Sequence, residues 1–346
     1  MGVRFSSSKF LRLKLKYLII NLVLVFALFL AYFSGPVIKF DPIDLDCRVE
    51  LPSDFTELVN YITEKEAQIR DLKPGNAARI LWATGKSEKT PYALVYLHGF
   101  SASHHEGYPV HIDVAERYGM NIYLSRLYDH GRKDTNSFRD LTPQDYYKSA
   151  VEALEIGKMI GDSIILMSCS TGSTLASILS HRYPEIAAHI MYSPNFALAN
   201  PTSSLILKPW GKQITKLYLK GENQRLNYPK DAPRFWNDTY HMNGIFVVKY
   251  LIEKYINDAL FSKFDRPVFM GCYYKNENEQ DDAVSVKAMR NFIEKIQTPA
   301  SKKKLIAFPE TGAHVIVSPI FSKDIEGPRD STFAFIENTL KIKPLE

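Results

Sequence analysis

The sequence predicts an α/β protein with a mostly parallel central sheet, helices on both faces of that sheet, and one apolar helix in front of it. Short apolar runs rich in β-branched residues recur along the chain and are typical of buried strands. They are 92–97, 121–126, 163–167, 188–192, 267–274 and 303–308. Helical spacing follows the third run, since Leu175, Ile178 and Leu179 share one face of 171–182.

Two more helices are marked by their start and stop signals. Thr142 offers a side-chain N-cap, Pro143 suits a first turn, and Asp145 can cap back. Residues 54–72 carry apolar side chains on one face and end at a Lys-Pro-Gly stop. We expect this second, amphipathic helix to pack against the large domain or to brace it near a bilayer.

The N-terminal segment predicts where the protein is located. Residues 17–33 are almost wholly apolar and no charge occurs in 17–38. Because about 20 apolar residues suffice to cross a bilayer, this segment is long enough to span one. The preceding cations, without any acid, are Arg4, Lys9, Arg12, Lys14 and Lys16. The positive-inside rule then predicts a cytoplasmic N-terminus and a domain on the translocated (periplasmic or extracytoplasmic) side. A cleaved signal peptide is the alternative, although Tyr32 or Phe33 would occupy a cleavage position that needs a small residue.

The domain organisation follows from these features. We expect a basic cytoplasmic tail at 1–16, a transmembrane anchor at 17–38, a connector with the amphipathic helix at 39–76, and one α/β domain at 77–346. Within that domain, about 195–264 forms an insertion between two strands. The insertion contains the aromatic residues Trp210, Phe235, Trp236, Tyr240 and Phe246.

The part of the chain after the basic tail is electrically neutral. The chain has 43 Lys and Arg against 38 Asp and Glu, and the five cations of residues 1–16 account for its net charge of +5. A neutral domain has no general field that attracts nucleic acid, so we expect no nucleic-acid partner. The basic tail suits the anionic headgroups of a cytoplasmic leaflet.

A serine lies between a predicted strand and a predicted helix, in Ser168-Cys169-Ser170-Thr171-Gly172. A sharp strand-to-helix turn lifts such a hydroxyl out of the sheet and aims the N-terminus of the helix at it. The turn is cramped, so the positions two before and two after the serine must be small, as Ser168 and Gly172 are. Ser168 replaces the glycine of the usual G-x-S-x-G pattern, and Cys169 is expected to point into the sheet.

Three further motifs follow predicted strands in a fixed order. The strand 92–97 ends in His98-Gly99-Phe100, and the strand 121–126 runs into Leu127-Tyr128-Asp129-His130-Gly131-Arg132. A late polar loop carries Asp281-Asp282-Ala283-Val284, and His314 follows the last strand. With these motifs, residues 77–340 resemble an α/β-hydrolase of the carboxylesterase and monoacylglycerol-lipase type, in which nucleophile, acid and base occur in this order.

The resemblance implies a catalytic triad of Ser170, Asp281 and His314. It further implies that the backbone N–H groups of Phe100 and Thr171 form an oxyanion hole, supported by the His98-Gly99 motif. Asp282 remains an alternative acid, because Ala283 weakens the match that fixes the register of the acid loop.

The implied chemistry is hydrolysis of carboxylic esters through an acyl-enzyme on Ser170. The aromatic insertion and the membrane segment favour a small-molecule or lipid-like hydrophobic ester, with the bilayer as a partner. Aminopeptidase, amidase or thioesterase activity on the same scaffold is an alternative, in which Glu222, Asp231 or Asp238 could bind a free amine. A catalytically inactive, membrane-tethered binding module is a further alternative.

We expect no metal and no cofactor. A cluster of His98, His104, His105, Glu106 and His111 matches no common zinc spacing. The three cysteines, Cys47, Cys169 and Cys272, are far apart and suggest no disulfide framework.

Overall fold

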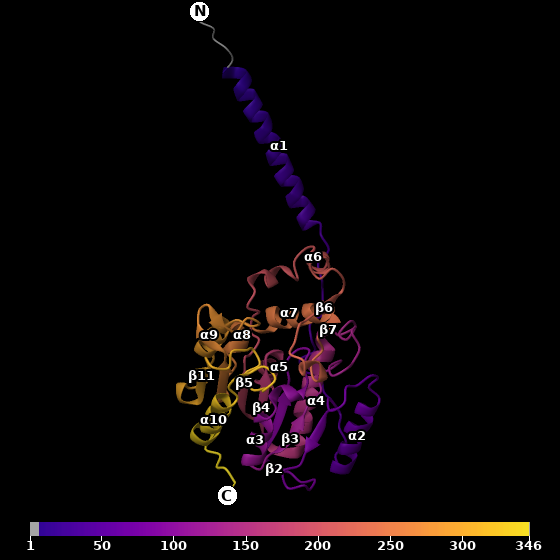
Figure 1. The fold of residues 1–346 in the computed structure, drawn as a ribbon, viewed down its shortest axis with the longest axis vertical. Helices are drawn as coiled ribbons and strands as arrows, with labels where there is room; N and C mark the ends of the chain where they lie inside the picture. Colours follow the sequence, from indigo (N-terminus) through magenta and orange to yellow (C-terminus); the bar gives the residue numbers. More distant parts are fainter. Residues whose placement is uncertain (1–6, 346) are drawn as a thin grey trace, which may run out of the picture.

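The N-terminal helix stands apart from the rest of the molecule. The computed structural model describes residues 7–345, so positions 1–6 of the predicted tail lie outside the described residues. Helix α1 (Ser7–Phe33) projects away from the domain (Figure 1). Its part Arg12–Phe33, 22 residues with a mean hydropathy of 2.2, is long and apolar enough to cross a membrane, and its apolar window is not buried by the protein. The helix ends at Phe33, so the last uncharged residues up to Ile38 are not helical.

A seven-stranded sheet forms the centre of the domain, as the sequence predicts. Its strand order is β1-β3-β2-β4-β5-β8-β11, and only the β1–β3 pair is antiparallel. The strands are β1 (Arg79–Leu81), β2 (Thr90–Leu97), β3 (Asn121–Leu124), β4 (Gly161–Cys169), β5 (Ile186–Tyr192), β8 (Val268–Cys272) and β11 (Lys303–Ala307). Strand β1 has no signal in the sequence, because its three residues are too few to show a period.

Both faces of the sheet are buried, which explains why its strands read as continuous apolar runs. Val95 and Leu97 of β2 point to one apolar layer, whereas Leu94 and Tyr96 point to the other. The helices α4 (Pro143–Ile160), α5 (Thr171–Leu179) and α7 (Asn243–Tyr255) contribute to the first layer, and α3 (Val110–Arg117) and α10 (Glu326–Phe335) to the second. Parallel strands place their carboxyl ends, and the loops that follow them, at one edge of this sandwich.

The predicted helix-start signal is confirmed at α4. Thr142 Oγ1 accepts a hydrogen bond from the Asp145 N–H at 3.0 Å. Asp54 caps α2 (Phe55–Ala67) by accepting from two backbone N–H groups. The prediction that α2 continues to Leu72 was wrong, because Leu72 pairs with Arg132 in an isolated β-bridge and Lys73 N donates to Gly131 O. Those pairings hold the chain in an extended form.

The insertion between β5 and β8 covers the end of the sheet that faces α1 (Figure 1). Its elements are η2 (Pro201–Leu205), α6 (Gly211–Tyr218), β6 (Asn223–Arg225), η3 (Ala232–Arg234), β7 (Thr239–His241), α7 and α8 (Asp258–Phe261). The strands β6 and β7 form a small antiparallel pair. Tyr240 and Phe246 are buried, so these two aromatic residues pack the insertion onto the domain.

Smaller elements complete the domain. They are η1 (His104–Gly107), β9 (Tyr274–Asn276), β10 (Glu279–Gln280), α9 (Val286–Lys295), η4 (Ala300–Lys302) and η5 (Ile336–Leu340).

Candidate active site

Ser170 occupies the turn between β4 and α5. Its backbone is in a left-handed region, φ 50° and ψ −120°, which a non-glycine residue rarely adopts. Strain of this kind persists only where the surrounding structure holds it, and it is typical of functional sites. A Cβ on Gly172 would overlap the carbonyl oxygen of Leu97, at the end of β2. The elbow and the end of β2 are therefore in direct contact, which explains why position 172 must be glycine.

Ser168 stands where the usual motif has glycine, and the structure accommodates its hydroxyl. Ser168 Oγ lies 2.9 Å from Ser173 Oγ inside the domain, so both buried hydroxyls have a partner. Cys169 is fully buried, as expected, and it belongs to the apolar layer on one face of the sheet.

His98 fixes the loop that follows β2. Its Nδ1 lies 2.9 Å from Gly99 O, and its Nε2 accepts a hydrogen bond from Leu127 N at 3.0 Å. The ring is therefore neutral with the proton on Nδ1, and burial lowers the pKa of His98 to about 4. Because the peptide unit is planar and trans, anchoring Gly99 O on one side turns the Phe100 N–H to the other. Thr171 is the first residue of α5, where N–H groups lack partners within the helix.

Glu106 is a buried carboxyl group beside Ser170 that sequence reasoning did not place in the site. The Gly99 N–H donates to Glu106 Oε2 at 2.6 Å, and the Tyr96 hydroxyl does so at 3.4 Å. A Cβ built on Gly99 would lie 2.7 Å from Glu106 Oε1 and 3.0 Å from Ser170 Cβ. Burial raises the pKa of Glu106 to about 7, although the Gly99 N–H and the charge of His314 oppose that rise. The signal in the sequence is an acidic residue seven positions after Gly99.

Asp281 and His314 are in direct contact. His314 Nδ1 lies 2.7 Å from Asp281 Oδ2. Asp281 Oδ1 accepts hydrogen bonds from Ala283 N and Val284 N, each at 3.0 Å. Asp281 is buried whereas Asp282 is exposed, so this geometry favours Asp281 as the partner of His314. Ala283 takes part through its backbone alone, since its N–H donates to Asp281 and its carbonyl oxygen accepts from Ala199 N at 3.0 Å.

The charges around His314 raise the pKa of its imidazole. Burial alone would lower the pKa of its imidazole, but the charge and hydrogen bond of Asp281, with Glu106 and Asp282 further off, outweigh burial and raise it above 6.5.

The loop after β5 connects the nucleophile to the histidine. Ser170 N donates to Tyr192 O at 2.9 Å, and Asn195 N donates to Ser170 O at 3.0 Å. Ser193 Oγ donates to His314 O at 2.6 Å. Within residues 7–345 no hydrogen bond joins Ser170 Oγ to His314; such bonds are often long before substrate binds and tighten in the complex.

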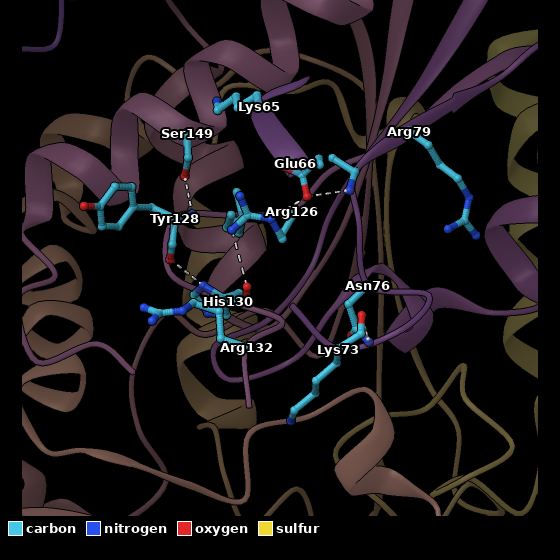
Figure 2. Close-up of polar contacts among 12 residues, drawn as sticks. Lys65, Glu66, Lys73, Asn76, Arg79, Arg126, Tyr128, His130, Arg132 and Ser149 are labelled. Atoms are coloured by element: carbon cyan, nitrogen blue, oxygen red, sulfur yellow. Dashed lines mark hydrogen bonds and ion pairs between the residues drawn. The ribbon is translucent and has the colours of Figure 1, made fainter. Parts of the chain in front are cut away.

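The loop after β3 is braced by a buried ion pair. Arg126 Nε donates to Glu66 Oε2 at 2.6 Å, and both side chains are almost fully buried. Figure 2 shows Arg126 reaching Glu66. It also shows Ser149 beside the backbone of Tyr128, and Ser149 Oγ accepts a hydrogen bond from the Tyr128 N–H at 3.1 Å. Asp129 in this loop adopts φ 60°, which Asp tolerates better than most residues. This network holds the Leu127 N–H against His98.

A small apolar cluster joins the three parts of the site. It contains Ala102 from the loop after β2, Ala232 and Trp236 from the insertion, and Val315 next to His314. Trp236 packs edge-on against Phe321, with ring centroids 5.0 Å apart. Phe235 packs against this cluster and stacks on His105, with ring centroids 3.7 Å apart. Trp210 is not part of the cluster.

The histidine cluster has structural partners. His111 Nε2 lies 2.8 Å from His104 O, and His98 is engaged as described above. In the part of the chain that the structure describes, no three His, Cys, Asp or Glu side chains are grouped as metal ligands would be.

Comparison with known proteins identifies the fold. No family model and no curated relative matches the sequence. One similar solved structure comes from work on LipS and LipT, two metagenome-derived lipolytic enzymes, with a TM-score of 0.61 and 16% identity over 77% of this chain and 99% of that chain. Another is BpoC from Mycobacterium tuberculosis H37Rv, provisionally assigned as a non-heme bromoperoxidase. Its TM-score is 0.53 and its sequence identity is 12%, over 80% of this chain and 99% of that chain. The chain thus has the α/β-hydrolase fold that its motifs predicted.

Proposed function

We propose that this protein is a membrane-anchored serine hydrolase that cleaves carboxylic esters. The observation that carries the proposal is the Asp281–His314 hydrogen bond of 2.7 Å, next to a serine on a strained elbow. The likeness to lipolytic enzymes supports ester hydrolysis on this fold.

The residues can carry out both halves of an acyl transfer. Ser170 Oγ attacks the ester carbon while His314 Nε2 takes its proton, and Asp281 stabilises the imidazolium that forms. The N–H groups of Phe100 and Thr171 hold the negative charge that develops on the carbonyl oxygen. His314 then gives the proton to the departing alcohol. Water, deprotonated by His314, attacks the acyl-enzyme and releases the acid and free Ser170.

The substrate we propose is hydrophobic or lipid-like. The apolar cluster contains Ala102 from the loop after β2 and Val315, the residue after His314. An acyl group bound between these two loops would therefore meet apolar side chains. If helix α1 spans the bilayer and the domain lies on the translocated side, the active site stays near lipid. Of the acids considered for binding a free amine, Glu222 is paired with Lys216 at 3.0 Å, which weighs against an aminopeptidase.

The test is turnover of p-nitrophenyl esters from acetyl to long acyl by the full chain in detergent. We expect hydrolysis with a preference for longer acyl groups, and its loss in Ser170→Ala. Labelling by a fluorophosphonate probe should occur in the wild type and not in that variant. Probe labelling without ester turnover would move the proposal to thioesters or amides, and neither labelling nor turnover would indicate an inactive binding module.

A further inference from the structure

The segment 205–220 of the insertion presents an exposed apolar surface. We call Leu205, Trp210, Ile214, Leu217 and Tyr218 the α6 surface. Ile214, Leu217 and Tyr218 are spaced i, i+3 and i+4, so they lie on one face of helix α6. Leu217 and Tyr218 are 80% and 83% exposed, more than the large apolar residues of α1. Side chains of this kind in such a patch mark a contact with a partner or a membrane.

This surface is fixed to the end of α1. Trp210 Nε1 donates to Ala31 O at 2.9 Å, and Trp210 N donates to Pro36 O at 3.0 Å. A Cβ on Gly35 would overlap the Trp210 indole, so the ring packs directly on that glycine. Figure 1 shows α6 at the end of the domain from which α1 departs. The place where α1 ends therefore sets the level of the α6 surface.

The length of α1 puts that level at a membrane boundary. The candidate span Arg12–Phe33, whose first five residues carry three cations, rises about 33 Å at 1.5 Å per residue, close to the roughly 30 Å hydrocarbon core of a bilayer. If this part spans the core, the boundary between hydrocarbon and headgroups falls near Phe33, and Ala31 and Gly35 bring Trp210 to the same depth.

Cations accompany the apolar side chains. The segment contains Lys208, Lys212, Lys216 and Lys220. Beside α6, a cavity of about 600 Å³ is lined by Lys39, Arg139 and Lys212, with Glu222 as its carboxylate. Lys212 and Lys216 lie on the polar face of α6, opposite Ile214, Leu217 and Tyr218, and Lys216 pairs with Glu222 at 3.0 Å. Lysines on the polar face of an amphipathic helix are typical of segments that lie in a bilayer interface, where cations near an anionic surface add to binding.

We propose that the α6 surface lies in the headgroup region of the bilayer that α1 crosses, as a second membrane contact that holds the insertion against anionic lipid. The inference rests on the proposed anchoring by α1. One flexible connection would let the domain tumble, whereas two contacts joined through Trp210 fix its orientation, with the insertion toward the lipid.

The test is the depth of fluorescent labels in the full chain, reconstituted in nanodiscs of phosphatidylcholine and phosphatidylglycerol. In a Cys47→Ser background, an environment-sensitive dye is attached to Leu217→Cys, to Leu24→Cys within α1, or to Leu345→Cys near the C-terminus at the opposite end of the molecule. We expect spin-labelled lipid to quench the first two labels severalfold and to leave the third unchanged. Quenching at position 217 should weaken in nanodiscs of phosphatidylcholine alone.

The outcomes separate the two proposals. Quenching at position 24 without quenching at position 217 would overturn the α6 contact and leave the anchor in place. No quenching at position 24 would overturn anchoring and the α6 contact together, while ester turnover, measured on the same samples, would stand independently. A position-217 label that is shielded from water but not quenched by lipid, in a particle twice the expected mass, would overturn the lipid contact in favour of a second copy of the chain.

A substitution links the contact to activity. Leu217→Asp with Tyr218→Asp should lower turnover of an ester dissolved in vesicles at least tenfold and leave turnover of soluble p-nitrophenyl butyrate unchanged. Leu345→Asp is the matched control and should change neither rate. Unchanged turnover of the vesicle ester in the double variant would contradict a role of the contact in reaching lipid substrates.

Discussion

At the scale of single residues, the site depends on which polar atoms have a fixed partner. Asp281 uses one carboxylate oxygen for two backbone N–H groups and the other for His314. Such a carboxylate holds the imidazole in one tautomer and one orientation. Its neighbour Asp282, which has the same chemistry one position later, is exposed and has neither role.

The first prediction separates these two carboxylates. Asp281→Asn should lower kcat/KM for an ester roughly 10³- to 10⁴-fold, because the amide favours the wrong tautomer of His314. Asp282→Asn should change it less than about threefold. The measurement is steady-state hydrolysis of p-nitrophenyl butyrate by both variants. A larger loss in the Asp282 variant would transfer the acid role to that residue.

The second prediction concerns pH. His314 must be neutral to take a proton, so activity should rise with pH through its pKa, and because that pKa is raised, the acid limb of kcat/KM should lie above pH 6.5. Glu106 has a pKa of about 7 and its negative charge helps to raise the pKa of His314. Glu106→Gln keeps an acceptor for the Gly99 N–H but removes that charge, so the limb should move to lower pH.

The control is Glu294→Gln, which removes an exposed carboxylate on α9 and should leave the profile unchanged. An identical pH profile in the Glu106 and Glu294 variants would contradict an electrostatic role for Glu106. Glu106→Ala is a different change, because it leaves the buried Gly99 N–H without an acceptor and should cost about 1–3 kcal/mol of stability.

At the scale of elements, close contacts between loops decide which positions tolerate change. The elbow and the end of β2 touch through Gly172, and the loop after β3 reaches α2 through the Arg126–Glu66 pair. These contacts join segments that are about 60 residues or more apart in the chain. They position His98, and with it the loop that carries Phe100.

The third prediction tests the elbow. Gly172→Ala places a Cβ against the backbone oxygen of Leu97, which cannot move without disturbing β2. It should destabilise the protein by roughly 1–3 kcal/mol as an overpacked site does, and lower kcat. Gly221→Ala is the control, because a Cβ there would meet no atom within 4 Å, and it should change stability by less than about 0.5 kcal/mol. Thermal unfolding of both variants is the measurement, and equal stabilities would contradict the close approach.

The fourth prediction tests the brace beneath the loop after β3. Glu66→Ala leaves the buried Arg126 guanidinium without its partner, so it should destabilise the protein by about 3–5 kcal/mol. Lys65 pairs with Glu152 nearby, but its side chain is 43% exposed, so Lys65→Ala should cost less than about 1 kcal/mol. The free energy of unfolding in denaturant is measured for both variants. Similar losses of stability would show that the buried Arg126–Glu66 pair contributes no more than the exposed Lys65–Glu152 pair.

At the scale of the whole molecule, the direction in which α1 leaves the domain matters as much as its length. The helix departs from the end of the sheet that the insertion covers (Figure 1). The insertion, and not the opposite end with the C-terminus, is therefore the part of the domain that an anchored protein would bring near lipid.

The fifth prediction is the topology of the chain. The cations before the apolar run predict a cytoplasmic N-terminus. The cells are treated so that protease reaches the outer side of the membrane that α1 crosses, while that membrane itself stays closed. Added protease should then remove a C-terminal tag and leave an N-terminal tag protected. Protection of both tags would contradict translocation, and release of the C-terminal tag with the domain into the soluble fraction would indicate a cleaved signal peptide.

The sequence by itself determined the elements whose physics is local. Strand runs such as 92–97, the cap at Thr142, and the apolar N-terminal helix depend on neighbouring residues, and all were predicted. The order of the motifs around Ser170, Asp281 and His314 predicted the fold. Boundaries failed where a distant segment intervened, as at Leu72, which pairs with Arg132.

Only the tertiary structure decided the relations between distant residues. It distinguishes Asp281 from Asp282 because a carboxylate one position apart points into a different environment. It places Glu106 against Gly99, and Trp210 against the end of α1, across separations of 7 and 179 residues. No local pattern encodes such contacts, because they arise from how the packed sheet and its insertion bring separate loops to one place.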